Sequence, residues 1–157
     1  MIVEPSWLIV ARREAWSGVR EIPGPPNSAR VLSYHAATTL RATQDAVPWC
    51  AAFVCWALHE ADYRSTRSAA ARSFLGWGLD LDTPAHGSIV VLSRGANAPP
   101  ATVRDAPGHV GFLVGRPRQD EVLVLGGNQA DAVNVRAYPL SRVLGFRWPL
   151  REDRIAA

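Results

Sequence analysis

The stretch that decides the fold is VPWCAAFVCWALHEA, residues 47–61. Pro48 suits the first turn of a helix, because a helix leaves the N–H groups of that turn unpaired. The residues that follow are apolar around much of the helical circumference, which is typical of a buried helix. We therefore expect a central helix that begins at Trp49 or Cys50 and ends near Ala61, with Cys50 in its first turn.

Weaker helical patterns flank this stretch, and β-type patterns follow it. Helices are expected over Ser6–Ala15, from Asn27 or Ser28 to about Leu40, and over Ser68–Leu75. Further along, the apolar runs become short and alternate with turn residues. Helices followed by closely spaced strands predict an α+β fold with an antiparallel sheet, in one domain over residues 1–157. The expected strands are Ser88–Leu92, His109–Val114, Glu121–Leu125, Ala132–Tyr138 and Gly145–Trp148.

The composition is that of a globular protein with a mild positive charge. Apolar residues make up 48% of the chain, charged residues make up 20%, and the formal net charge is +3. All 17 basic residues are arginine and they are scattered, so no basic patch predicts nucleic-acid binding. No apolar run approaches the roughly 18 residues of a membrane span. The first residues do not resemble a signal peptide, so we expect synthesis in the cytoplasm without one.

The two cysteines, Cys50 and Cys55, both lie on the expected central helix. At about 100° per residue they point about 140° apart, so they are not expected to form a disulfide. Cys55 can then face the core while Cys50 faces outward. Cys55 and His59 could hold half of a metal site, but no second pair has ligand spacing. No metal or other cofactor is therefore expected.

Cys50 and His109 are the candidate nucleophile and base. The field of a helix N-terminus lowers the pKa of a thiol, and an imidazole partner lowers it further. His109 opens an apolar strand and could lie opposite that helix end, where it would act as general base and then as general acid. Taken alone, Cys50 could also be a small apolar residue of a buried helix. The other histidines, His35, His59 and His86, are interpreted as structural.

Asn128 follows the third expected strand, within the sequence Gly-Gly-Asn-Gln. Its side-chain amide could accept the second ring N–H of His109 and fix the tautomer, as in a Cys-His-Asn triad. Gly-Gly-Asn could also be an ordinary turn. Competing polar candidates are Gln129, Asp45 and Asp131.

The substrate groove is expected beside these residues. The backbone N–H of Cys50 is the expected donor to the oxyanion. The loops at 18–27 and 94–107 are rich in Gly and Pro and are expected to line the groove. The side chains expected to contact the substrate are Trp49, Asp45 and Gln129.

Several segments, spread over most of the chain, match one known family. They are Glu21–Gly24, Pro48–Val54, Gly108–Phe112, Leu125–Gln129 and Gly145–Pro149. The chain resembles the papain-like cell-wall amidohydrolases of the CHAP and NlpC type, and more closely a small phage-associated or bacterial subfamily. The resemblance implies a papain-like fold with Cys50 as nucleophile, His109 as base and Asn128 as the polar residue that orients it. Many CHAP domains carry a Glu two residues before that Asn, where this chain has Gly126.

The resemblance also implies a substrate class, the amide bonds of bacterial peptidoglycan, cleaved by an amidase or an endopeptidase. Some relatives bind calcium through acidic residues ahead of the cysteine, but only Asp45 is present here, so no calcium is expected. Alternatives are another papain-like cysteine peptidase or acyltransferase, and a non-catalytic wall-binding module. The expected protein is a monomer that acts on the wall in the periplasm or outside, after phage lysis or machine-driven export. An immunity protein is a further candidate partner.

Overall fold

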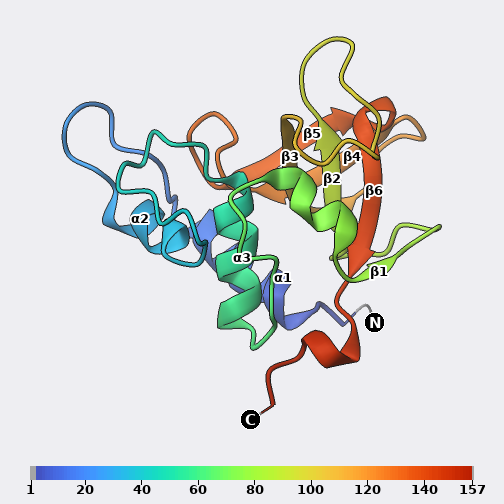
Figure 1. Cartoon of the computed structure of the whole chain (residues 1–157), viewed down its shortest axis with the longest axis horizontal. Coiled ribbons are helices and arrows are strands. Elements are labelled where there is room, and N and C mark those ends of the chain that lie inside the picture. The colour runs from blue at the N-terminus through green and yellow to red at the C-terminus, as the bar shows by residue number, and fades with distance from the viewer. Residues whose placement is uncertain (1–2, 157) are drawn as a thin grey trace.

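Three helices precede a six-stranded sheet in the computed structural model, which describes residues 3–156. The elements are α1 (Ser6–Trp16), α2 (Ala29–His35), α3 (Cys50–Glu60), η1 (Ala71–Gly76), β1 (Leu79–Asp80), β2 (Ile89–Ser93), β3 (Gly108–Gly115), β4 (Glu121–Gly126), β5 (Asn134–Pro139), η2 (Leu140–Arg142), β6 (Val143–Trp148) and η3 (Arg151–Asp153). All strand pairs are antiparallel, in the order β1-β6-β2-β3-β4-β5 (Figure 1). The α+β prediction is confirmed.

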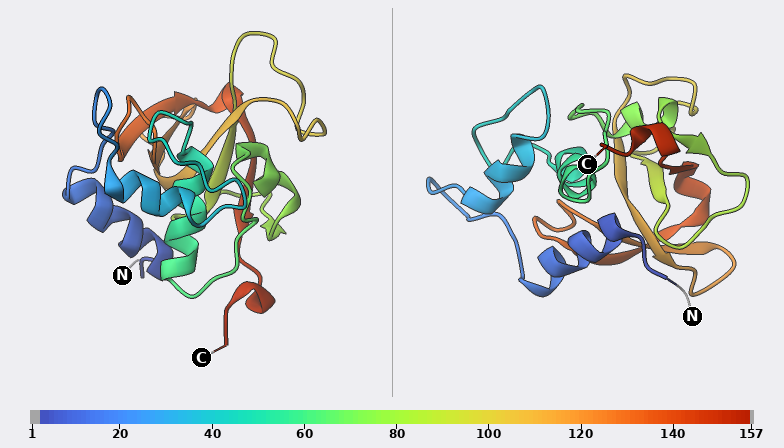
Figure 2. Two further views of the ribbon diagram at one scale, coloured as in Figure 1. Left: turned by 60° about the vertical axis from the view of Figure 1, so that its left-hand side comes forward. Right: turned by 90° about the horizontal axis from the view of Figure 1, so that it is seen from below.

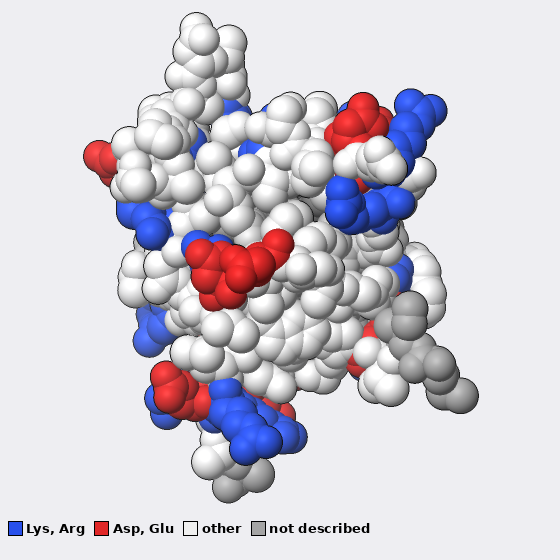
Figure 3. Space-filling model, turned by 90° about the vertical axis from the view of Figure 1, so that its right-hand side faces the viewer, with Lys and Arg blue, Asp and Glu red and all other residues white. Residues whose placement is uncertain are grey.

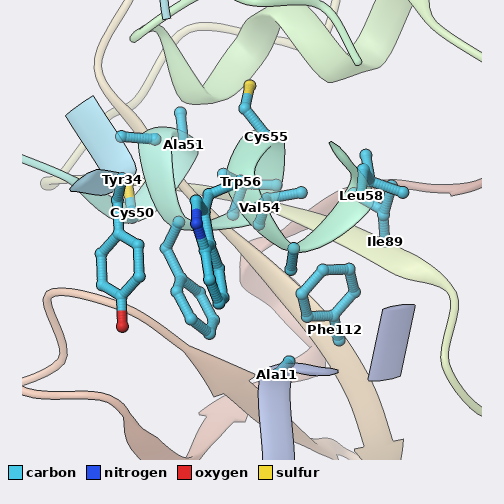
Figure 4. Packing of buried hydrophobic residues seen from close by; sticks show 14 of the residues in the cluster. Ala11, Tyr34, Cys50, Ala51, Val54, Cys55, Trp56, Leu58, Ile89 and Phe112 are labelled. Atoms are coloured by element: carbon cyan, nitrogen blue, oxygen red, sulfur yellow. The ribbon is translucent and has the colours of Figure 1, made fainter. Parts of the chain in front are cut away.

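α3 is the buried centre of the molecule, as the sequence predicts. Every residue from Cys50 to Leu58 is buried, and the Phe53 ring lies 6.4 Å from the Phe112 ring of β3. The three α-helices lie on one side of the sheet (Figure 2). Figure 4 shows α3 side chains packed between α1, α2 and the strands. α3 is therefore packed closely against the sheet.

The sheet is apolar on both faces. Val91 and Val110 belong to the cluster under the helices, whereas Val90, Leu92 and Val124 form a second cluster on the opposite face. This is why the sequence of β2 is apolar throughout rather than alternating. The second face matters for the site. In β3, the side chains that alternate with the helix-facing Val110 point to this second face.

Some predicted boundaries are wrong. α2 ends at His35 rather than near Leu40, because the N–H groups of Ala37 and Thr38 bond three residues back and the Thr38 hydroxyl donates to the His35 carbonyl. The segment predicted as a helix from Ser68 is instead a 3₁₀ helix at Ala71–Gly76. β1, which pairs with β6, was not predicted.

Charged side chains are spread over the surface in small groups. On the face shown in Figure 3, most of the surface is uncharged, and acidic and basic groups lie beside one another in small clusters. This face has no continuous basic stripe of the kind that follows a nucleic-acid backbone. No helix within residues 3–156 is long and apolar enough to cross a membrane.

Candidate active site

Cys50 is the first residue of α3, and Trp49 precedes it as the N-cap. Trp49 is fully buried, and its indole Nε1–H donates to Glu21 Oε1 at 2.7 Å. Both cysteines are free and buried, with Cys50 only 5% exposed, so the expectation that Cys50 faces outward is wrong. Figure 4 shows their sulfurs on different sides of the helix. The Cys55 sulfur lies 3.8 Å from the Thr66 hydroxyl.

The surroundings of the Cys50 sulfur change the expected protonation state. Burial raises the pKa of the thiol, although the backbone N–H groups of Val110 and Ala51 and the charge of Arg94 act to lower it. The prediction of a lowered thiol pKa is therefore wrong, because burial outweighs the effect of the helix N-terminus. The N–H of Val110 belongs to the residue after His109, so the sulfur lies beside the start of β3.

His109 is the second residue of β3, where it pairs with Leu92 of β2. It is 4% exposed, and its ring Nε2 lies 3.0 Å from Gln129 Oε1. Burial lowers the pKa of His109 to about 4, against the effect of the Gln129 hydrogen bond and with help from the positive charges of Arg94 and Arg142. At neutral pH the site therefore contains a neutral thiol and a neutral imidazole.

Gln129 fixes the His109 tautomer, because its own orientation is determined by other partners. The Gln129 Nε2 group donates to the carbonyl oxygens of Val124 at 3.2 Å and Asn134 at 2.7 Å. The Tyr138 hydroxyl donates to Gln129 Oε1 at 3.0 Å. The amide oxygen must then face His109, whose Nε2 carries the proton and donates. The other ring nitrogen, Nδ1, is left unprotonated and can act as a base.

Two glycines bring the histidine and the helix together at the end of β4. A Cβ on Gly126 would lie 2.9 Å from Gln129 Oε1 and 3.4 Å from His109 Nε2. A Cβ on Gly127 would lie 2.6–2.7 Å from atoms of Trp49 and Phe53. Only glycine allows this close approach on both sides. The Gly-Gly pair thus lies between the His109–Gln129 pair and the N-terminal end of α3.

The residue that accepts the hydrogen bond of His109 is therefore Gln129, which was only a competing candidate, and not Asn128. Asn128 has a φ of +55°, a left-handed conformation that Asn tolerates, and it leads into a turn closed by the bond from the Gln129 N–H to the Ala132 carbonyl. The turn places the Gln129 side chain under the ring. Asn128 lies next to the site without a hydrogen bond to His109 among residues 3–156.

The side chains expected to contact the substrate are all buried: Trp49, Asp45 and Gln129. Asp45 Oδ2 accepts the backbone N–H groups of Ile22 at 3.0 Å and Ser28 at 2.8 Å, which lowers its pKa. It therefore ties the loop at 18–27 to the segment before α3. A cavity of about 490 Å³ lies beside this loop, lined by Arg20, Glu21, Pro23 and Asp131.

Sequence reasoning did not identify Tyr138, Arg94 or Arg142. The Tyr138 ring lies 5.4 Å from the His109 ring, and the Arg142 guanidinium lies 5.1 Å over the Tyr138 ring. Nothing in the local sequence marks these residues. Tyr138 reaches the site through the pairing of β5 with β4, Arg94 through the pairing of β2 with β3, and Arg142 through its bonds to the Ser93 carbonyl. The alternation of β5 does show that Tyr138 faces one side of the sheet.

The remaining histidines lie away from this site. His35 is buried in α2, His59 is exposed near the end of α3, and His86 Nε2 lies 3.1 Å from Glu4 Oε1. Within residues 3–156 no group of three or more His, Cys, Asp or Glu side chains is arranged to hold a metal ion. A larger cavity, of about 700 Å³, lies near the C-terminal end of α3, beside Trp56 and Tyr63. It does not include Cys50 or His109.

A family model of the CHAP domain matches residues 42–128, more than half of the chain. This chain belongs to the CHAP domain family. The match includes Cys50 and His109 and ends one residue before Gln129. CHAP domains are typically cysteine- and histidine-dependent amidases or peptidases, so membership supports a peptidoglycan hydrolase-type activity in general. No curated protein and no solved structure matches the chain significantly.

Proposed function

We propose that this CHAP domain is a cysteine amidohydrolase that cleaves amide bonds of peptidoglycan, as an amidase or an endopeptidase. The observation that carries the proposal is the hydrogen bond from His109 Nε2 to a fixed Gln129 amide, beside a helix that begins with Cys50. This is the nucleophile, base and orienting residue that thiol catalysis needs.

The neutral state of the site favours a general-base mechanism. The Cys50 sulfur attacks the substrate carbonyl carbon while His109 Nδ1 takes the thiol proton. The backbone N–H of Cys50 donates to the oxyanion of the tetrahedral intermediate. The C–N bond then breaks, and His109 returns the proton to the leaving amine. Water hydrolyses the thioester with His109 again as base, which restores the thiol.

The imidazolium that forms in each half of the reaction needs support, and Gln129 Oε1 supplies it. This oxygen accepts the Nε2–H bond and holds the ring in one orientation throughout. Gln129, rather than Asn128, is therefore proposed as the orienting residue. Phage release or machine-driven export would bring the protein to the wall, and both routes stay predictions, as do the monomeric state and an immunity partner.

The test is digestion of purified sacculi with the wild type, Cys50→Ala and Cys55→Ala. Wild type and Cys55→Ala should release new free amines, and Cys50→Ala should release none. Cys55 is the matched control, because it is buried on the same helix but held by Thr66 and the Ser68 carbonyl. New reducing sugar ends, or equal amine release by all three proteins, would contradict the proposal.

The non-catalytic alternative has one observation in its favour, the burial of both Cys50 and His109. A wall-binding module would sediment with sacculi while releasing no amines. Amine release above the Cys50→Ala background excludes it.

A further inference from the structure

Two arginines lie beside His109 on the side of the site formed by the strands. Arg142 donates from Nε and Nη2 to the Ser93 carbonyl at 3.0 and 2.8 Å. Its guanidinium also lies over the Tyr138 ring, which is tilted against His109. Arg94 follows Ser93 directly, and Ser93 pairs with Gly108, the residue before His109. Arg142 is therefore anchored near the His109 ring, and the charge of the exposed Arg94 also acts on that ring.

No acidic side chain neutralises these two arginines. Within residues 3–156, none of the ion pairs includes Arg94 or Arg142. A group of carboxylates lies around Trp49 instead. There, burial and the charges of Asp131 and Asp45 raise the pKa of Glu21. We call the group of His109, Gln129, Tyr138, Arg94 and Arg142 the strand side, and the group of Trp49, Glu21, Asp45 and Asp131 the helix side.

The positive charges of Arg94 and Arg142 disfavour protonation of His109 during the reaction unless a negatively charged group binds beside them. His109 must accept a proton during attack, yet both arginines act with burial to keep it neutral. The groups that contact His109 are the Gln129 amide and the Tyr138 ring, and neither carries a charge at pH 7. An anion between the arginines would offset their field and make His109 a stronger base.

We propose that Arg94 and Arg142 bind a carboxylate that the substrate carries next to the scissile amide, so that cleavage requires a free carboxylate at that position. This inference rests on the proposed amidohydrolase function. Guanidinium groups recognise carboxylates through paired, charge-assisted N–H···O bonds. A carboxamide of the same size has no charge to offset the arginines and is a poor substrate.

The experiment uses two synthetic wall peptides that differ only in a carboxylate or a carboxamide next to the cleaved bond. The wild type, Arg94→Gln, Arg142→Gln and the control Arg13→Gln, which changes an exposed arginine on α1, are compared by kcat/KM. We expect the wild type and the control to favour the carboxylate by at least about tenfold. Arg94→Gln and Arg142→Gln should each lose about tenfold in kcat/KM on the carboxylate peptide and little on the carboxamide peptide, so that the preference for the carboxylate disappears.

A pH profile separates substrate binding from a general effect on the thiol. With the carboxylate peptide, the acid limb of kcat should lie at higher pH than the acid limb of kcat/KM, because bound substrate raises the pKa of His109. With the carboxamide the two limbs should coincide. Equal losses on both peptides, or equal cleavage of both by the wild type, would overturn the carboxylate site and leave the proposed function intact. Cleavage of neither peptide, together with no amine release from sacculi, would overturn both.

Discussion

On the helix side, the polar groups of Trp49 and Asp45 are used to hold the chain together. The Trp49 indole is bonded to Glu21, and Asp45 holds the backbone of the preceding loop. On the strand side, Tyr138, Gln129 and His109 form a chain of hydrogen bonds that leaves one ring nitrogen free. Under the proposed function, the helix side would hold Cys50 in place, and the strand side would control the transfer of the proton. Changes on the two sides should therefore have different effects.

The largest effect is expected from removal of the base. His109→Ala should lower kcat/KM for amide cleavage by about 10²–10⁴-fold, which is the usual contribution of a general base. Released amines give the rate. His59→Ala, a change at an exposed histidine of the same type, should leave the rate unchanged. If His109→Ala keeps a tenth of the wild-type activity, His109 is not the general base of the reaction.

The burial of His109 should also make the free energy of unfolding depend on pH. Its pKa is about 4 in the folded protein and about 6.5 when exposed, so between these pH values the unfolded chain binds a proton that the folded chain does not. Stability should therefore fall as the pH drops from 6.5 to 4, by about 3 kcal/mol for this group, because each pKa unit corresponds to about 1.4 kcal/mol.

Urea unfolding at pH 7 and pH 4 measures this change. His109→Asn should show a smaller loss of stability between the two pH values than the wild type, whatever its stability at pH 7. His59→Asn should keep the wild-type loss. Identical losses in the wild type and His109→Asn would mean that the ring is hydrated in solution.

The sequence predicts the helix side better than the strand side, and the reason is physical. α3 and Cys50 follow from a local pattern of Pro48 and continuous apolar residues. His109 is predicted from its place at the start of an apolar strand. Gln129 does not, because whether residue 128 or 129 points at the ring depends on a turn with three left-handed residues, Asn128, Ala130 and Asp131.

The protonation states of the site could not be predicted from local sequence. The N–H groups at the start of α3 lower the pKa of the Cys50 thiol, but the packing of α3 against β3 and β4 buries the sulfur, and burial raises the pKa by more. Arg94 and Arg142 reach His109 only because β2 pairs with β3 and because η2 returns the chain toward Ser93. Such effects depend on contacts between segments that are distant in sequence.

The next largest effect is expected at Gln129, and the same experiment distinguishes the role of Gln129 from that of Asn128. Gln129→Ala removes the acceptor for the His109 Nε2–H and should lower kcat/KM by about 10–100-fold. Asn128→Gly, which suits the left-handed backbone at that position, should change kcat/KM by less than about threefold. A larger loss in Asn128→Gly than in Gln129→Ala would return the orienting role to Asn128.

A charge at the same place gives a second test of the Gln129 position. Gln129→Glu keeps the shape of the side chain but replaces the Nε2 group, which donates to the Val124 and Asn134 carbonyls, with an oxygen. These contacts should be lost, and kcat/KM should fall at least as far as in Gln129→Ala. Wild-type activity in Gln129→Glu would mean that the orientation of residue 129 is not fixed by these two carbonyls.

Tyr138→Phe should have a smaller effect, because it removes only the second donor to Gln129 Oε1. The loss of one neutral hydrogen bond corresponds to about 1 kcal/mol, or about fivefold in kcat/KM. The ring and its contact with His109 are kept, so the folded structure should be unchanged. The nitrogen NMR shifts of His109 should show a mixture of tautomers where the wild type shows the Nε2–H form alone. A single tautomer in Tyr138→Phe would mean that Gln129 needs no help from Tyr138.

Trp49→Phe should have the smallest effect on activity, because it changes only the helix side. It removes the hydrogen bond from the indole to Glu21 and should lower the free energy of unfolding by about 1–2 kcal/mol. The value of kcat/KM should stay within about threefold at a temperature where the variant is folded. Glu21→Gln is the matched control, because it keeps an acceptor for the indole and should destabilise less. If Trp49→Phe loses more than tenfold in kcat/KM while its unfolding curve matches the wild type, the helix side also takes part in the reaction, and the division of roles between the two sides fails.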